Sequence, residues 1–317
     1  MKGINAFMDW LEDRLRARLA IWWVILLLVA LALIGIALLR RSSLLSTALL
    51  YIGIPSTLAF AITLLRAPKP DQPWWHQYRE LSLISLIVFL ASSMVLSEGF
   101  ICIAFFLPIY FLVISIVFLC HRFIVTRKRR SGKLMVSILP LLILVSAFEG
   151  TTESLSLERV SYTTATRVAN LTPDQVMRNL TRPIDLNKRR NWLLSVFPMP
   201  YHFDAGSLNP GDIHRIHTRY HRWFVTNTHR GELHLQILEV TPTEVHTRII
   251  HDTTFFSTYL TQIGTRISLN EIAPGQTEIT LRFDYRRNLD PAWYFHPLQK
   301  YAMSQMAGFF IDEVMIR

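Results

Sequence analysis

The distribution of apolar residues along the chain constrains its fold more than any other feature. The long apolar runs lie before Phe148, whereas polar and apolar residues alternate after that position. A helix needs about 20 predominantly apolar residues to cross the hydrocarbon core of a bilayer. We therefore expect two parts, a membrane domain over residues 20–148 and a water-soluble domain over residues 158–317.

Five apolar segments are predicted to span the membrane. They cover residues 20–39, 44–65, 81–97, 101–120 and 134–148. The fifth segment is shorter and carries a proline, so on its own it could equally form a re-entrant or buried helix. Residues 1–19 place apolar side chains at helical spacing, which predicts an amphipathic helix on the cytoplasmic face or a polar extension of the first span.

The basic residues of the short loops predict the orientation of these spans. The first 150 residues carry 15 Lys and Arg against 7 Asp and Glu, and the largest basic cluster lies between Arg122 and Lys133. The positive-inside rule then favours five spans in the inner (cytoplasmic) membrane, with a cytoplasmic N-terminus and a periplasmic or extracellular C-terminal domain. With four spans the C-terminal domain would instead be cytoplasmic.

The second half alternates in the manner of an antiparallel sheet. Strands are predicted over residues 159–168, 212–220, 231–240, 244–254, 264–272 and 277–286. Thr172, followed by Pro173, predicts the start of a short helix, and a second short helix is plausible at 187–197. Pro291 opens a long helix to about Ile316. We expect an α+β fold in which a curved antiparallel sheet wraps around this helix.

The order of these elements resembles the START-like, or SRPBCC, superfamily, which includes polyketide cyclases and Bet v 1-like proteins with the helix-grip fold. The matching stretches are Thr172 to Val176, Pro198 to Pro200, Leu208 to Asp212, Gly275 to Glu278 and Tyr285 to Pro297. The whole chain looks like a member of this superfamily fused to a multi-span membrane region. The resemblance implies a pocket for lipids or other apolar molecules, and it does not by itself imply catalysis.

Eight side chains are the candidates for lining such a pocket. They are Phe283, Tyr285, Trp293, Tyr294, Met303, Met306, Phe309 and Phe310. The apolar side chains of the predicted last helix would also be expected if that helix only packed against a filled core. Two other functions stay open: a protein-interaction or sensor module, and a cyclase- or hydrolase-like enzyme using polar groups such as Arg215, Tyr220, Tyr259, Asp284 or Tyr285. We assign no catalytic residue and expect no cofactor, because no nucleophile elbow, P-loop or dinucleotide fingerprint occurs.

The charge balance and the positions of the Cys and His residues argue against nucleic-acid binding and metal binding. The second half is nearly neutral, with 18 basic and 16 acidic residues, so we expect no nucleic acid partner. Cys102 and Cys120 lie within an apolar run and are interpreted as small buried hydrophobes. Nine of the 11 histidines lie in the second half, but they are scattered, and we expect no bound metal. His214 and His217 should face opposite sides of one strand, and His234 and His246 could be neighbours across a hairpin.

Overall fold

A computed structural model describes residues 27–41, 44, 46–65, 73–95, 100–131, 139–186, 199–223 and 226–316 of the chain. The predicted amphipathic helix at 1–19 and the predicted short helix at 187–197 lie outside these residues. The chain folds into two compact units, and the boundary between them falls between Leu155 and Ser156.

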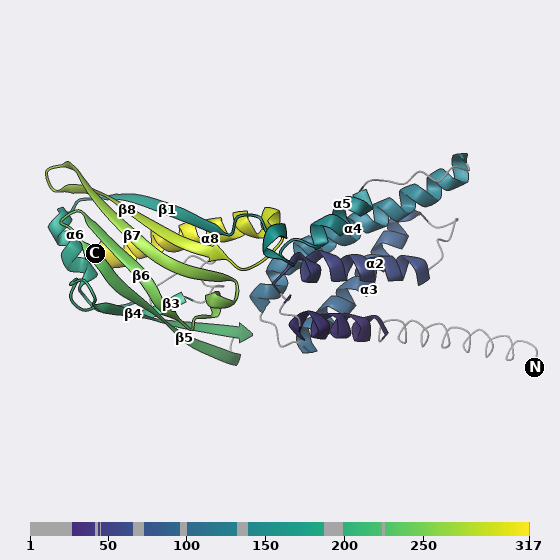
Figure 1. Ribbon diagram of the computed structural model, residues 1–317, viewed down its shortest axis with the longest axis horizontal. Coiled ribbons are helices and arrows are strands. Elements are labelled where there is room, and N and C mark those ends of the chain that lie inside the picture. Colours follow the sequence, from purple (N-terminus) through teal and green to yellow (C-terminus); the bar gives the residue numbers. More distant parts are fainter. Residues whose placement is uncertain are drawn as a thin grey trace, which may run out of the picture. The chain divides into compact units, whose positions relative to one another are not determined.

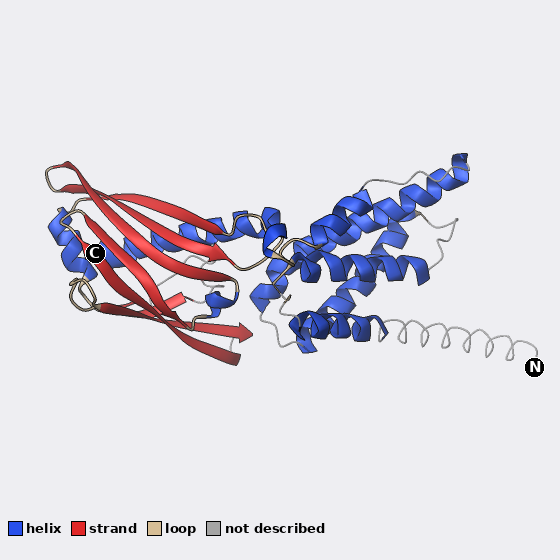
Figure 2. Cartoon of the chain, in the orientation of Figure 1, coloured by secondary structure: helices blue, strands red, loops and turns tan. Residues whose placement is uncertain are grey.

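The N-terminal unit consists of helices (Figures 1 and 2). Residues 27–41 are helical, and the other elements are η1 (Leu49–Gly53), α2 (Ile54–Leu65), α3 (Trp74–Val95), α4 (Phe100–Ser131), α5 (Leu139–Ala147) and η2 (Glu153–Leu155). Apolar side chains such as Leu28, Leu58, Ile84 and Ile114 form a core shared by the helix at residues 27–41 and by α2, α3 and α4.

One segment of the described helices meets the length and composition of a membrane span. It is Phe105–Ile124 within α4, with a mean hydropathy of 2.1, and Leu49–Thr63 is a shorter apolar helix. The structure describes two further apolar helices only from residues 27 and 139 onward, namely those at residues 27–41 and Leu139–Ala147. The multi-span arrangement therefore stays a prediction.

The C-terminal unit contains one eight-stranded sheet in the order β1-β8-β7-β6-β5-β4-β3-β2, and its paired strands run antiparallel. The strands are β1 (Val160–Ala169), β2 (Ile184–Asp185), β3 (Met199–Asp204), β4 (Ile213–Trp223), β5 (Thr226–Val240), β6 (Glu244–Asp252), β7 (Leu260–Ala273) and β8 (Gln276–Arg287). The helices are α6 (Pro173–Leu180), η3 (Phe255–Thr258), α8 (Ala292–Phe310) and η4 (Ile311–Met315).

The sheet curves around α8, as Figure 1 shows. Strand β8 follows the alternation expected of a half-buried strand, with Ile279, Leu281 and Phe283 buried between partly exposed polar residues. These side chains form one core with Met303, Ala307 and Ile311 of the C-terminal helical segment. A curved antiparallel sheet that holds a long C-terminal helix is the helix-grip arrangement, so the predicted fold class of this unit is confirmed.

Local sequence explains where the short helix begins. Thr172 is the N-cap of α6: its hydroxyl accepts a hydrogen bond from the Gln175 backbone N–H, and the Gln175 side chain accepts one from the Thr172 N–H. This reciprocal pair satisfies two N–H groups that the first turn would otherwise leave unpaired. Pro173 occupies the first helical position, where its missing N–H costs nothing.

Three details differ from the sequence-based expectation. Strands β2 and β3 were not predicted, and the predicted single helix to Ile316 ends as α-helix at Phe310 and continues as the π-helical turn η4. His234 pairs with His251, while His246 pairs with Glu239, so the predicted contact between His234 and His246 is wrong. The reason is that the tight β5–β6 turn sets Val240 opposite Val245, and this register carries His234 well past His246.

Candidate functional site

A cavity lies on the inner face of the sheet, between the strands and the C-terminal helical segment. Its volume is about 80 Å³. Seventeen of its lining side chains are apolar, including Ile216, Leu233, Val245 and Ile267 from four successive strands. Met306 and Phe310 of α8 line it from the helix side. The cavity is therefore a predominantly apolar space within the core of the C-terminal unit.

Six polar side chains complete the lining. They are His214, Thr218, Thr247, Thr254, Gln262 and Thr265. Among the described residues, no Asp, Glu, Lys or Arg lines this cavity. Such a surface can bind an apolar molecule and can orient it through a small number of hydrogen bonds.

Two of these polar side chains form a pair on neighbouring strands. Thr247 of β6 lies opposite Thr265 of β7, and their hydroxyl oxygens are 2.7 Å apart. The backbone N–H of Thr265 also donates to the Thr247 hydroxyl at 3.3 Å. This places both hydroxyls firmly in the cavity wall.

A second polar group surrounds the carboxylate of Asp252. Thr254 donates both its N–H and its hydroxyl to one oxygen of Asp252, at 2.8 and 2.7 Å. The amide nitrogen of Gln262 lies 3.4 Å from the other oxygen. Asp252 thus holds two lining side chains in place without itself lining the cavity.

His214 enters the cavity wall from β4. It is buried, and its Nε2 lies 2.8 Å from the carbonyl oxygen of Ser207. Because a carbonyl oxygen only accepts, Nε2 carries the proton, and Nδ1 is left as an acceptor when the ring is neutral. The loop that supplies this carbonyl is ordered by Asp212, which accepts from the Ser207 hydroxyl and from the Asn209 N–H.

The structure brings some of the eight candidate pocket residues together at the cavity and places others elsewhere. Phe283, Met306 and Phe310 line it. Tyr285 and Met303 are buried in the core without lining it, and Phe309 packs against that core. Tyr294 is partly exposed, whereas Trp293 is 49% exposed.

The polar lining was not anticipated from the sequence, although a signal for it exists. Thr247 follows Val245 by two positions, and Thr265 precedes Ile267 by two. Residues two apart on a strand share a face, so both threonines could have been assigned to the buried side. The polar groups proposed for an enzyme-like pocket lie elsewhere: Arg215 is exposed, and Asp284 pairs with Arg282 at 2.7 Å.

Five histidines of the C-terminal unit lie on the other, partly exposed face of strands β3 to β6, namely His202, His217, His234, His246 and His251. Glu232 contacts two of them: its carboxylate lies 3.4 Å from His217 Nδ1 and 3.1 Å from His234 Nε2. His251 lies beside His234, with ring centroids 4.8 Å apart. The hydrogen bond from His234 is the main cause that lowers the pKa of Glu232. Within the described part of the chain, no group of three or more His, Cys, Asp or Glu is arranged to hold a metal ion.

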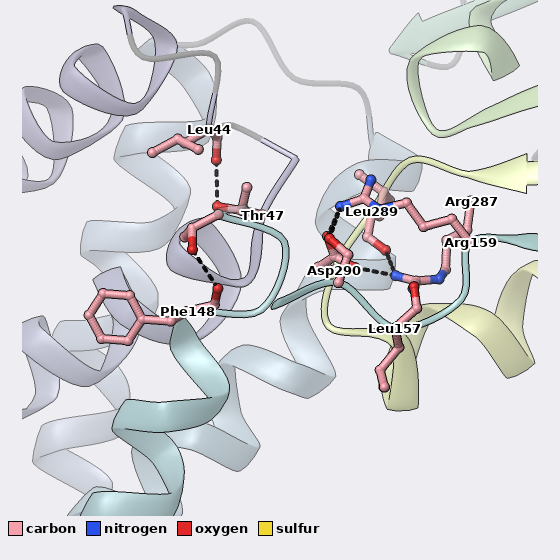
Figure 3. A network of polar contacts seen from close by, with 10 residues as sticks. Leu44, Thr47, Phe148, Leu157, Arg159, Arg287, Leu289 and Asp290 are labelled. Carbon is pink, nitrogen blue, oxygen red and sulfur yellow. Dashed lines mark hydrogen bonds and ion pairs between the residues drawn. The ribbon is translucent and has the colours of Figure 1, made fainter. Parts of the chain in front are cut away.

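A buried ionic network lies at the start of α8 (Figure 3). Asp290 accepts hydrogen bonds from both Arg159 and Arg287, and Arg287 also donates to the carbonyl oxygens of Leu289 and Leu157. Arg287 and Asp290 are fully buried. The network joins the segment before β1 to the turn between β8 and α8, and none of its members lines the cavity.

Solved structures with a similar arrangement exist, although no protein family model and no curated protein matches the chain. A START superfamily protein from Mycobacterium smegmatis is 9% identical, and the match covers 49% of this chain and 94% of that chain, with a TM-score of 0.30. The Zhui aromatase/cyclase from a Streptomyces species is 9% identical over 49% of this chain and 93% of that chain, with a TM-score of 0.31. A norcoclaurine synthase from Thalictrum is 9% identical over 49% and 92%, with a TM-score of 0.33.

Proposed function

We propose that the C-terminal unit is a binding module for an apolar ligand, such as a lipid or a similar molecule. The observation that carries this proposal is the cavity between the sheet and the C-terminal helical segment, whose described lining holds no Asp, Glu, Lys or Arg. Moving an apolar molecule from water into such a space is favourable by roughly 25 cal/mol per Å² of surface buried. The six polar groups would orient the ligand.

The volume of the cavity limits how much of a ligand can be enclosed in this conformation. Its volume of about 80 Å³ exceeds the roughly 10–15 Å³ that one water needs. It is smaller than the roughly 300–1,000 Å³ of pockets that enclose drug-sized ligands. A short molecule, or the end of a longer chain, fits without rearrangement. A larger ligand would require Met306, Phe310 or their helix to move outward.

We further propose that the N-terminal unit anchors this module in a membrane through five spans. The described helices within or overlapping the predicted segments support this, namely residues 27–41, Leu49–Leu65, Trp74–Val95, Phe100–Ser131 and Leu139–Ala147. The loop between the fourth and fifth segments carries six basic residues from Arg122 to Lys133 and supports a cytoplasmic position for that loop. The C-terminal unit would then lie on the extracytoplasmic side, in reach of lipid from the adjacent leaflet.

Native mass spectrometry of the full chain, released from lipid nanodiscs, tests ligand binding. We expect a reproducible bound mass that the variant Val245→Phe loses, because the new ring would fill the cavity from β6. The matched control is Val168→Phe, on an exposed position of β1, which should keep the bound mass. A chain that is always recovered empty, or a bound mass retained by Val245→Phe with an unchanged melting temperature, would contradict the proposal.

A second candidate function is a protein-interaction module without a ligand. The small volume of the cavity favours it, because a nearly filled core needs no small molecule. We do not propose an enzyme: acid–base catalysis in a cyclase-like pocket would need a pair of acid–base side chains, and His214 is the one His, Asp, Glu, Lys, Arg, Tyr or Cys in the described lining. The interaction function predicts that Val245→Phe leaves the protein's activity in the cell intact, whereas ligand binding predicts its loss.

A further inference from the structure

The hydrogen bonds of the cavity wall leave specific donors for a ligand. In the Thr247–Thr265 pair, one hydroxyl donates to the other across 2.7 Å. Whichever of the two donates, the other hydroxyl keeps its own proton uncommitted. The pair therefore offers one O–H donor toward the cavity, in addition to oxygen lone pairs.

Gln262 and His214 add a further donor and two acceptors. One N–H of the Gln262 amide is directed to Asp252 at 3.4 Å, so the second N–H and the carbonyl oxygen remain for other partners. The Nε2 proton of His214 is committed to the Ser207 carbonyl, which leaves Nδ1 as an acceptor. Donors and acceptors thus occur together in one lining.

The charges around the cavity disfavour an ionic ligand. The described lining holds no Lys or Arg that could pair with a carboxylate, and no Asp or Glu that could pair with an ammonium group. Two lining side chains contact the carboxylate of Asp252 outside the lining, and the hydrogen bonds from Thr254 and Gln262 already occupy its oxygens. An unpaired charge that loses its water shell costs far more free energy than a hydroxyl that finds new hydrogen-bond partners.

We infer that the cavity selects an amphiphile whose polar group is an uncharged hydroxyl or carbonyl, and that it rejects the corresponding carboxylate and ammonium compounds. This inference rests on the proposed ligand-binding function. The Thr247–Thr265 pair and Gln262 hold the polar group of the ligand, while its apolar part lies against Val245, Ile267 and Met306. The selectivity comes from the mixture of uncharged donors and acceptors.

A matched series of ligands on the full chain in nanodiscs tests this selectivity. The probes are 1-hexanol, hexanoate, hexylammonium and n-hexane at pH 7.5, and the readout is the NMR signal of the 13C-labelled methyl group of Met306. We expect hexanol to bind at least about tenfold more tightly than either ion, a difference of about 1.4 kcal/mol. Binding of hexanoate or hexylammonium within about twofold of hexanol overturns the inference but leaves ligand binding intact. If none of the probes, n-hexane included, shifts the Met306 signal, the proposed function itself fails.

Paired variants test whether the threonines supply the hydrogen bond. Thr247→Val with Thr265→Val keeps the shape of the wall and should weaken hexanol binding about fivefold or more, while n-hexane binds as before. The matched control is Thr166→Val with Thr280→Val, which removes a similar hydroxyl pair, 3.0 Å apart, from the exposed face of β1 and β8. Unchanged hexanol affinity in the cavity variant, or an equal loss in the control, overturns the assignment. If the cavity variant does not fold, the probe series on the unaltered chain still tests the selectivity for an uncharged polar group.

Discussion

Asp290 accepts from both arginines of the buried ionic network in the C-terminal unit. Its carboxylate is fully buried between two arginines that come from opposite ends of the unit's sequence, Arg159 before β1 and Arg287 at the end of β8. A buried ion pair adds little net stability compared with apolar residues of the same shape. Removing one partner is costly, because the other charge is left without compensation.

We predict that Asp290→Asn destabilises the C-terminal unit by about 3–5 kcal/mol, because Arg287 would remain charged and buried beside a neutral amide. Chemical unfolding followed by tryptophan fluorescence measures the change. The control is Asp312→Asn, which removes an exposed ion pair with Arg167 at 3.3 Å and should cost less than about 1 kcal/mol. Equal losses in the two variants would show that the buried network has no special weight.

Glu232 gives a second prediction, concerning pH. The hydrogen bond from His234 holds the pKa of Glu232 below its ordinary value of 4.5, and the charges of His217, His234 and Arg215 act in the same direction. Since the pKa is depressed in the folded state, the stabilisation from the carboxylate is present above pH 4.5 and is lost as the pH falls through the folded pKa.

NMR titration of the Glu232 side-chain carbon should therefore give a midpoint below 4.5, and His234→Ala should move that midpoint upward. His246→Ala is the control, because His246 contacts Glu239 and Glu244 instead. A midpoint that does not respond to His234→Ala would contradict the assigned cause.

The candidate pocket residues show what sequence can and cannot predict about single side chains. The apolar stripe on the last helix was identified, but its members do not share one environment. Trp293 lies 13 positions before Met306, which at 1.5 Å per residue is a separation of about 20 Å along the helix axis. Met306 and Phe310, four positions apart, lie on one face and both line the cavity. The position of the cavity along the helix depends on the sheet, which sequence periodicity does not give.

At the scale of elements, strong alternation predicted the strands well and weak signals did not. The prediction for β8, residues 277–286, differs by one residue at each end from Gln276–Arg287, because the inward positions from Thr277 to Tyr285 are Thr or apolar and aromatic residues. Strand β3 was missed because it is short and contains Pro200, and a proline usually argues against a strand. The β5–β6 register was missed because turn geometry and irregular pairing at His234 and Ile237 fix it, and periodicity reports neither.

Gly264 supplies the prediction that belongs to this scale. It lies at an irregularity in the pairing of β7 with β8, and a Cβ added there would approach the Thr247 carbonyl oxygen to 2.3 Å. That oxygen belongs to the backbone of β6 and cannot move without distorting the sheet. Gly264→Ala should therefore cost about 1–3 kcal/mol.

Thermal unfolding of the full chain measures this loss. Gly206→Ala is the matched control, because an added Cβ at that position meets nothing within 4 Å, and it should change the melting temperature little. A Gly264→Ala variant as stable as Gly206→Ala would mean that β6 and β7 are farther apart than the structure shows. Because Gly264 adjoins Thr265, the same variant should also weaken ligand binding in the cavity.

At the scale of the whole molecule, composition predicted a change of character between residues 148 and 158, and the main division between the two compact units falls between Leu155 and Ser156. The first part is rich in apolar residues because its helices contact lipid in the proposed arrangement. The second alternates because its sheet has one buried and one exposed face. Composition does not decide on which side of the membrane the second part lies. That depends on whether the segment at 134–148, of which Leu139–Ala147 is described as helix, crosses the bilayer.

The orientation can be tested with single cysteines in a chain whose Cys102 and Cys120 are replaced by serine. We expect Gly206→Cys, in an exposed loop of the C-terminal unit, to react with a membrane-impermeant maleimide in intact spheroplasts. Lys128→Cys, within the basic cluster from Arg122 to Lys133, should react only after permeabilisation, because positive-inside places that cluster in the cytoplasm. If both positions require permeabilisation, the segment at 134–148 does not cross and the membrane domain has four spans. The ligand would then have to reach the cavity from the cytoplasm. Whether the segment at 134–148 crosses the bilayer therefore determines from which side of the membrane the ligand enters.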